Sequence, residues 1–131
     1  MRLPRTVFDT AEDIKTMRVR GAGRIARAAV RALRSVAESS EARDPAQFME
    51  ELTEASRILV STRPTAVSLP NSIRFVFLRA MEAYEKEVSV EELKEVVLKA
   101  ADEFIKNSET ALDRIAEFGS RRIRDGDTLM T

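Results

Sequence analysis

A long helical repeat that neither glycine nor proline interrupts is the strongest constraint that this sequence places on its fold. Apolar residues recur every three or four positions from Leu93 to Phe118, and the next glycine is Gly119. This spacing keeps one apolar stripe along one side of an α-helix. A helix that continued to about Arg124 would be about 50 Å long. A compact domain of 131 residues does not need so long a helix, so we expect it to lead into another domain.

The rest of the chain also has helical spacing, and we expect an all-α domain of about five helices that ends in the long one. Residues 5–17 predict a first helix with Phe8, Ala11 and Ile14 on its apolar side. Phe and Met residues at this spacing are interpreted as core. The apolar sides of three further helices are Ile25, Ala29, Ala32 and Val36; Phe48, Leu52, Ala55 and Leu59; and Ile73, Val76, Phe77, Ala80, Met81 and Tyr84.

Local signals predict where these helices start and stop. The stretch Asp44-Pro45-Ala46-Gln47 combines an acidic N-cap, a proline in the first turn and a capping-box glutamine. Ser89 opens a second capping box, at the start of the long helix. Pro64 disfavours helix at Arg63 and predicts the end of the third helix. The stretch STRPTAVSLPN, with Pro64 and Pro70, is expected to be the one long non-helical segment.

The last residues predict the boundary of the domain. Asp125, Gly126 and Asp127 are typical of a turn that ends a helix, and residues 128–131 resemble the opening of a strand. We therefore expect a helical domain over residues 1–124 and the beginning of an α/β domain at 125–131. The two aspartates are interpreted as part of the turn, and no catalytic residue is assigned.

Composition excludes several classes of function. The chain has 22 Lys and Arg against 22 Asp and Glu, a balance that argues against direct nucleic-acid binding. It has no Cys and no His, so it lacks a thiolate, the usual general base and the commonest metal ligand. We expect no metal site, no cofactor and no reactive group. Without a long apolar run or a leader pattern, we expect a cytoplasmic protein that does not contact membranes.

Charge is distributed unevenly along the chain. Residues 1–36 carry nine basic and three acidic residues, a net charge of +6, whereas residues 37–54 carry a net charge of −5. This asymmetry favours intramolecular pairing or a local anionic ligand over a polyanion partner. Five arginines form a stripe on the second predicted helix: Arg20, Arg24, Arg27, Arg31 and Arg34. We interpret Arg27, Arg31 and Arg34 as a solvated or ion-paired face.

Residues Arg20-Gly21-Ala22-Gly23 predict an anion site. A glycine turn that opens a helix presents unpaired backbone N–H groups, and arginine adds charge-assisted hydrogen bonds. The alternative is that the two glycines merely permit a tight turn. Residues 21–26 also match the dinucleotide fingerprint G-x-G-x-x-G/A, but no strand is predicted before them, so this interpretation is rejected.

The stretch RPTAVSLPN predicts a second binding element. An arginine in a loop braced by prolines keeps its guanidinium fork free for phosphate, which makes Arg63 a candidate ligand. Thr65, Ser68 and Asn71 add polar groups. Ser68 or Asn71 as the cap of the following helix is an equally good interpretation.

These motifs, in this order, and the segment EFIKNSETALDRIAEFGSRRIRDGDTLMT resemble the amino-terminal part of archaeal ribose 1,5-bisphosphate isomerases. Those enzymes share a superfamily with methylthioribose-1-phosphate isomerases and with the α, β and δ subunits of translation initiation factor 2B. The resemblance covers essentially the whole chain. It implies a helical domain that the long helix joins to a Rossmann-like domain, with the substrate in the cleft between them.

The resemblance also implies roles for particular residues. Arg20, Gly21, Ala22 and Gly23 would hold a substrate phosphate, and Arg63 would contact the substrate. The family's catalytic Cys and Asp would lie beyond Thr131, so this chain alone would be inactive. The implied reaction isomerises ribose 1,5-bisphosphate to ribulose 1,5-bisphosphate in nucleotide degradation, in a homo-oligomer, without a metal or nicotinamide.

Two other functions remain open at this stage. A translation-factor subunit would use the helical domain as a regulatory surface for a protein partner, and a scaffold domain would only support oligomer contacts. The Arg63 loop favours the enzyme, because translation-factor members of the superfamily usually lack it.

Overall fold

The computed structural model describes residues 3–19, 21–62 and 68–122, with side chains described as far as Ser108. The described residues form five helices and no strand. This confirms the expected all-α domain that ends in one long helix. The helices are α1 (Arg5–Lys15), α2 (Ala22–Ser39), α3 (Pro45–Val60), α4 (Ser68–Glu85) and α5 (Val90–Arg122).

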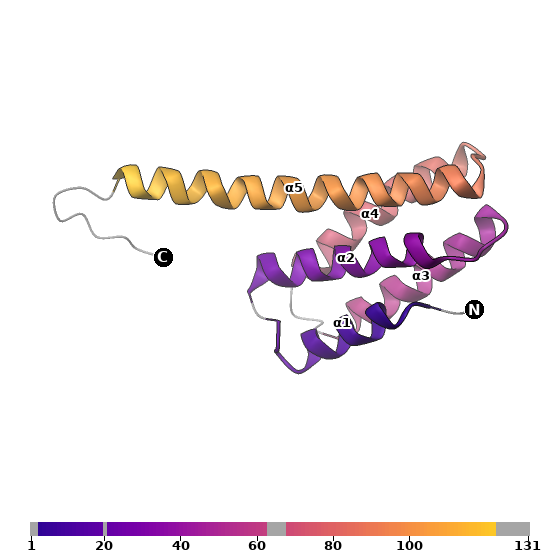
Figure 1. The fold of residues 1–131 in the computed structure, drawn as a ribbon, viewed down its shortest axis with the longest axis horizontal. Helices are drawn as coiled ribbons and strands as arrows, with labels where there is room; N and C mark the ends of the chain where they lie inside the picture. Colours follow the sequence, from indigo (N-terminus) through magenta and orange to yellow (C-terminus); the bar gives the residue numbers. More distant parts are fainter. Residues whose placement is uncertain (1–2, 20, 63–67, 123–131) are drawn as a thin grey trace.

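Helix α2 lies at the centre of the bundle and contacts each of the other four helices. Figure 1 shows α5 running along one side of the bundle and extending past the beginning of α2. Its 33 residues correspond to about 50 Å of helix. No helix in the described part of the chain is long and apolar enough to span a membrane.

The core follows the predicted apolar sides closely, with exceptions at the surface. The predicted core residues of α2 and α3, from Ile25 to Leu59, are buried. Phe8 was predicted to be core but is 50% exposed, and Val7 is buried in its place. Both residues lie one turn before Ala11, at three and four positions, so spacing alone does not distinguish them. The core interpretation was also wrong for Met17, which is exposed, and Tyr84 is exposed although it was predicted on the apolar side of its helix.

The predicted start signals act as helix caps. The Asp44 carboxylate accepts a hydrogen bond from the Gln47 N–H at 2.8 Å, and the Ser89 hydroxyl accepts one from the Glu92 N–H at 3.2 Å. The end of α3 comes at Val60, three positions before Arg63. Pro64 therefore predicts the end of α3 only approximately.

The expectation of a long non-helical segment was wrong for its second half. Helix α4 already begins at Ser68, so Ser68–Asn71 forms its first turn. Pro70 is compatible with this position, because first-turn N–H groups have no partner within the helix. A proline there does not break the helix.

Polar contacts join α2 to α5 along their antiparallel length. Lys94 Nζ donates to the Ser40 carbonyl at 3.0 Å, Arg34 Nε to Asp102 Oδ1 at 2.8 Å, and Arg27 Nη1 to Ser108 Oγ at 3.1 Å. Successive contacts are six to eight residues apart on both helices, which is about two helical turns. These three contacts define the α2–α5 seam.

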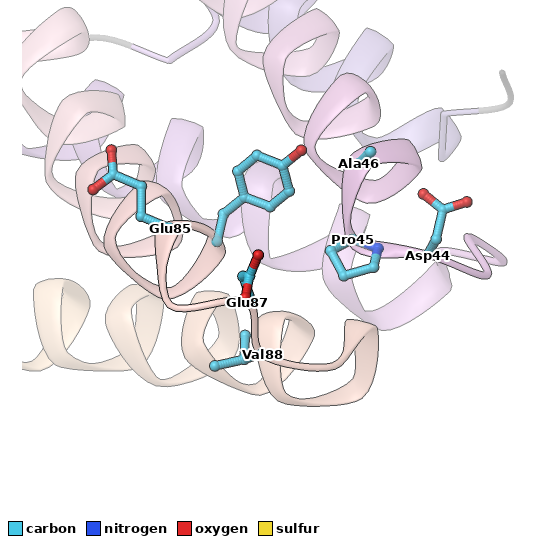
Figure 2. Close-up of a pocket in the computed structure, with 7 residues that line it drawn as sticks. Asp44, Pro45, Ala46, Glu85, Glu87 and Val88 are labelled. Atoms are coloured by element: carbon cyan, nitrogen blue, oxygen red, sulfur yellow. The ribbon is translucent and has the colours of Figure 1, made fainter.

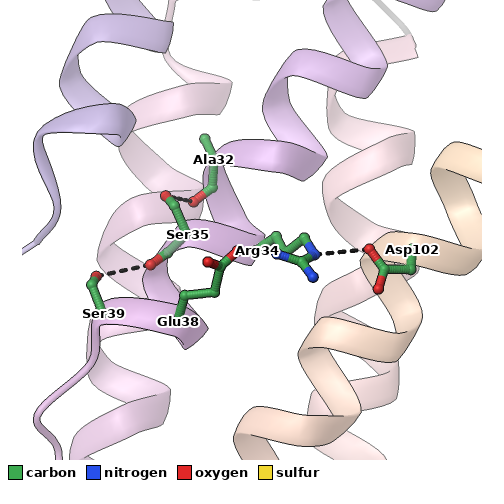
Figure 3. Close-up of polar contacts among 6 residues, drawn as sticks. All are labelled: Ala32, Arg34, Ser35, Glu38, Ser39 and Asp102. Carbon is green, nitrogen blue, oxygen red and sulfur yellow. Dashed lines mark hydrogen bonds and ion pairs between the residues drawn. The ribbon is translucent and has the colours of Figure 1, made fainter.

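The middle contact of the seam is an ion pair (Figure 3). Arg34 pairs with Asp102 across the seam and with Glu38 one turn along its own helix. The hydrogen bond to Asp102 is the main cause that raises the pKa of Arg34 above its ordinary value. The interpretation of this arginine as an ion-paired residue is confirmed, although α5 rather than residues 37–54 supplies one of the partners.

A cluster of aromatic and charged side chains joins α4 to α5. Arg79 donates two hydrogen bonds to Glu103, at 2.6 and 3.2 Å, and its guanidinium lies 4.6 Å from the centre of the Phe75 ring. The Phe75 and Phe104 rings are 5.5 Å apart. Helix α5 is thus fixed to the bundle from two sides.

The Asp44 cap yields a stability prediction. Asp44→Ala removes the acceptor of the Gln47 N–H and should lower the free energy of unfolding by about 1 kcal/mol. Asp44→Asn retains an acceptor and should stay within a few tenths of a kcal/mol of the parent. Urea unfolding of both variants measures the difference. Equal losses in the two variants would show that the charge, rather than the acceptor, stabilises α3.

Candidate anion-binding site at the start of α2

Gly21 has a backbone conformation that only glycine adopts easily. Its φ is +88° and its ψ is 136°, and it is the N-cap of α2. A Cβ built on Gly21 would meet no atom within 4 Å, so the glycine is required for its backbone angles and not for space. The sequence prediction of a glycine turn is therefore confirmed at this position.

The first N–H groups of α2 have no hydrogen-bond partner within the helix. The Ile25 N–H donates to the Gly21 carbonyl at 3.0 Å, and it makes the first hydrogen bond of the helix. The N–H groups of Ala22, Gly23 and Arg24 precede that bond, and Gly21 has no side chain to cap them. The positive end of the helix dipole lies at the same point. The start of α2 is thus suited to an anion.

Gly23 serves a different purpose from Gly21. It is helical, and a Cβ at this position would lie 3.1 Å from Arg27 Nη1. We predicted both glycines as part of an anion site. The structure shows a second reason for a glycine at position 23, because the absent Cβ leaves room for the guanidinium of Arg27.

Arg27 reaches back over the first turn of its own helix. Long helical side chains point toward the N-terminus, so the guanidinium lies beside residue 23 rather than beside its own Cα. From there Nη1 donates to the Ser108 hydroxyl of α5, and both side chains are partly buried. Sequence reasoning missed this pair, because 81 positions separate its members and neither carries a local signal.

Ser68 connects the two predicted binding elements. Its hydroxyl donates to the Ala22 carbonyl at 3.1 Å, so the first residue of α4 lies against the start of α2. Figure 1 shows both helices beginning at the same end of the bundle. Segment 63–67, which contains Arg63 and Thr65, immediately precedes Ser68 in the sequence. Arg20 and Arg63 themselves lie outside the described residues.

The hydrogen bond of Ser68 shows a role that differs from both of those the sequence left open, a ligand contact and a helix cap. Its hydroxyl links two helices by donating to a carbonyl. Asn71, the other candidate cap, lies within the first turn of α4 and is exposed. The structure therefore gives Ser68 a role in joining the two elements.

A groove at the opposite end of the bundle is unsuited to an anion. It has a volume of about 510 Å³ and lies between the start of α3 and the end of α4 (Figure 2). Asp44, Glu85 and Glu87 line it, and these carboxylates would repel a phosphate. Among the described residues, no cluster of His, Cys, Asp or Glu is arranged to hold a metal ion.

The helical bundle and its glycine turn define a known class of protein. Residues 18–131 match the model of the Initiation factor 2 subunit family, so this chain belongs to that family. A curated relative from Pyrococcus furiosus, ribose 1,5-bisphosphate isomerase, is 52% identical over 97% of this chain. The protein of the same name from Thermococcus kodakarensis is 50% identical over the whole chain. The chain spans about two fifths of the length of these relatives, 39% and 41% respectively.

Solved structures share the same helical fold. Subunit delta of translation initiation factor eIF-2B from A. fulgidus superposes with a TM-score of 0.77 at 33% identity, over 92% of this chain and 34% of that one. The 5-methylthioribose 1-phosphate isomerase from Pyrococcus horikoshii OT3 superposes with a TM-score of 0.67 at 34% identity, over 77% and 28%. The expected membership of this superfamily is confirmed.

The turn at Gly21 yields a second prediction. Gly21→Ala forces a side chain into a conformation that L-residues rarely adopt, at a cost of about 1–3 kcal/mol in the free energy of unfolding. Ala22→Ser, at the next and equally exposed position, should change it by less than about 0.5 kcal/mol. Denaturant unfolding of the two variants provides the comparison. A Gly21→Ala protein as stable as the parent would show that the turn does not have this conformation.

Proposed function

We propose that this chain is the substrate-binding helical part of an isomerase that converts ribose 1,5-bisphosphate to ribulose 1,5-bisphosphate in nucleotide degradation. The observation that carries the proposal is the Ser68–Ala22 hydrogen bond, which joins the glycine turn of α2 to the end of the Arg63 segment. The names of the relatives at 50% and 52% identity support the same reaction.

The chemistry of this substrate suits the site. Isomerisation moves a hydrogen from C2 to C1 and leaves both phosphates in place, so the enzyme must hold two dianionic groups while the carbon chain reacts. Backbone N–H groups at a helix start and arginine forks are the groups that bind phosphate well. We assign one phosphate to Arg20, Gly21, Ala22 and Gly23, and a further substrate contact to Arg63.

The catalytic groups would lie in a second domain. Residues 1–124 would form the substrate-binding domain, and residues 125–131 would begin a Rossmann-like domain that closes the site. Two observations support this division: the chain has no Cys or His, and it spans about two fifths of its curated relatives. We therefore expect this chain alone to be inactive.

We also propose a cytoplasmic homo-oligomer. A doubly phosphorylated sugar is too strongly charged to cross a bilayer unaided, so the enzyme should be in the compartment that produces it. Most soluble oligomers are symmetric assemblies of one chain, so further copies of the same protein are the expected partners. Nothing in the proposed reaction requires a membrane or a nucleic acid.

A second candidate function is a regulatory translation-factor subunit. The family's name and the delta-subunit structure from A. fulgidus favour it. Such a subunit would act through protein contacts and would not require a sugar phosphate. The two candidates therefore make opposite predictions for turnover.

The isomerase assignment can be tested directly. The protein expressed through the complete reading frame should convert ribose 1,5-bisphosphate to ribulose 1,5-bisphosphate, whereas residues 1–131 alone should not. Product formation followed by chromatography or a coupled carboxylation assay measures the conversion. A folded complete protein without turnover would favour the translation-factor subunit.

Arg63 provides a residue-specific prediction in the complete protein. Arg63→Ala should raise KM for the bisphosphate by about tenfold or more, because a charge-assisted contact contributes about 1.5–3 kcal/mol. Arg57→Ala removes a neighbouring arginine that pairs with Glu54 on the exposed surface, and it should leave KM unchanged. Steady-state kinetics separate the variants. Equal KM values for parent and Arg63→Ala would remove Arg63 from the site.

A further inference from the structure

We propose that Arg27 is a further binding determinant of the anion site, and that Ser108 of α5 positions it. This inference rests on the isomerase function proposed above and adds one residue from the middle of α2 and one from the long helix. Gly23 provides the space in which the guanidinium lies.

The start of α2 carries a concentration of positive charge. Residues 18–34 contain six arginines and no acidic residue, and the first turn of α2 has no acid. The Arg27 guanidinium lies beside residue 23, next to the positive end of the helix dipole. A cation at a helix start is unfavourable by itself. An anion bound there would convert this repulsion into attraction.

Two other arginines that contact α5 differ from Arg27 in the charge of their partners. Arg34 and Arg79 each meet a carboxylate of α5, Asp102 and Glu103 respectively. Among the described residues, the α5 partner of Arg27 is the neutral hydroxyl of Ser108. A hydroxyl fixes the direction of the guanidinium without neutralising its charge. Orientation and charge are therefore both available to a phosphate.

Position 23 leaves the Arg27 guanidinium close to the helix backbone. The Cβ of any other residue there would lie 3.1 Å from Arg27 Nη1, so the guanidinium would have to shift by a few tenths of an ångström. A glycine inside a helix costs up to about 1 kcal/mol relative to alanine. Glycine nevertheless occupies position 23, beside the Arg27 guanidinium, which fits a role for this arginine in binding.

The decisive variant is Ser108→Asp in the complete protein. It should place a carboxylate opposite Arg27, as Asp102 lies opposite Arg34, and neutralise the guanidinium without weakening the α2–α5 seam. We expect KM for ribose 1,5-bisphosphate to rise about tenfold and kcat to change less than about twofold. The melting temperature should stay the same or increase. A purely structural role for Arg27 would leave KM unchanged.

Two further variants complete the test. Arg27→Met retains the length of the side chain without its charge and should raise KM similarly, whereas Arg27→Lys should restore part of the loss. Asp102→Ser is the matched control, since it makes the Arg34 contact resemble that of Arg27 and should leave KM unchanged. Unchanged KM in both Ser108→Asp and Arg27→Met would overturn the inference.

Binding of inorganic phosphate distinguishes this inference from the proposed function. Calorimetric titration of the parent and the Arg27→Met protein does not depend on turnover. Weaker phosphate binding by Arg27→Met in a protein without isomerase activity would reject the isomerase and keep Arg27 as an anion ligand. Turnover by the parent with equal phosphate affinity and KM in the variant would keep the isomerase and reject Arg27.

Discussion

The close packing of α2 against its neighbours is the constraint on which the rest of the structure depends. Ala29 and Ala32 are completely buried, and their small side chains let other helices approach the α2 backbone. Every other helix contacts α2. The position of its first turn is consequently determined by the whole bundle, so a site built on that turn begins from a rigid element.

The α2–α5 seam holds α5 in place against α2 as far as the end of the bundle where the candidate site lies. Its three contacts are the Lys94–Ser40 hydrogen bond, the Arg34–Asp102 ion pair and the Arg27–Ser108 hydrogen bond. The exposed ion pair contributes little to stability by itself. The seam instead determines the register of the two helices, because three contacts about two turns apart fix the position of α5 along α2. The long helix therefore reaches the glycine turn with Ser108 opposite Arg27.

The helices could be predicted from sequence because their signals are local. The caps at Asp44 and Ser89 and the apolar spacing of α2 and α3 involve residues within a few turns of one another. Two predictions were wrong where a local rule allows two outcomes. Residues 68–71 were predicted to be non-helical, but Pro70 is tolerated in the first turn of α4. Phe8 was predicted to be buried, but the spacing to Ala11 allows either Phe8 or Val7 to face the core, and Val7 does. The candidate site was predicted as two separate motifs. The Ser68–Ala22 bond that joins them spans 46 positions, and the Arg27–Ser108 bond that joins α5 to the start of α2 spans 81, so only the fold reveals either bond.

The two glycines of the turn are present for different reasons, one related to the stability of the fold and the other to binding. Gly21 is explained by its backbone angles and would be needed with or without a ligand. Gly23 and Arg27 are not explained in this way, since alanine at position 23 would favour the helix and a cation at its start disfavours it. At Arg34 the carboxylates of Glu38 and Asp102 compensate the positive charge. Among the described residues, the partner of Arg27 on α5 is an uncharged hydroxyl, so the composition of this turn makes physical sense when an anion completes it.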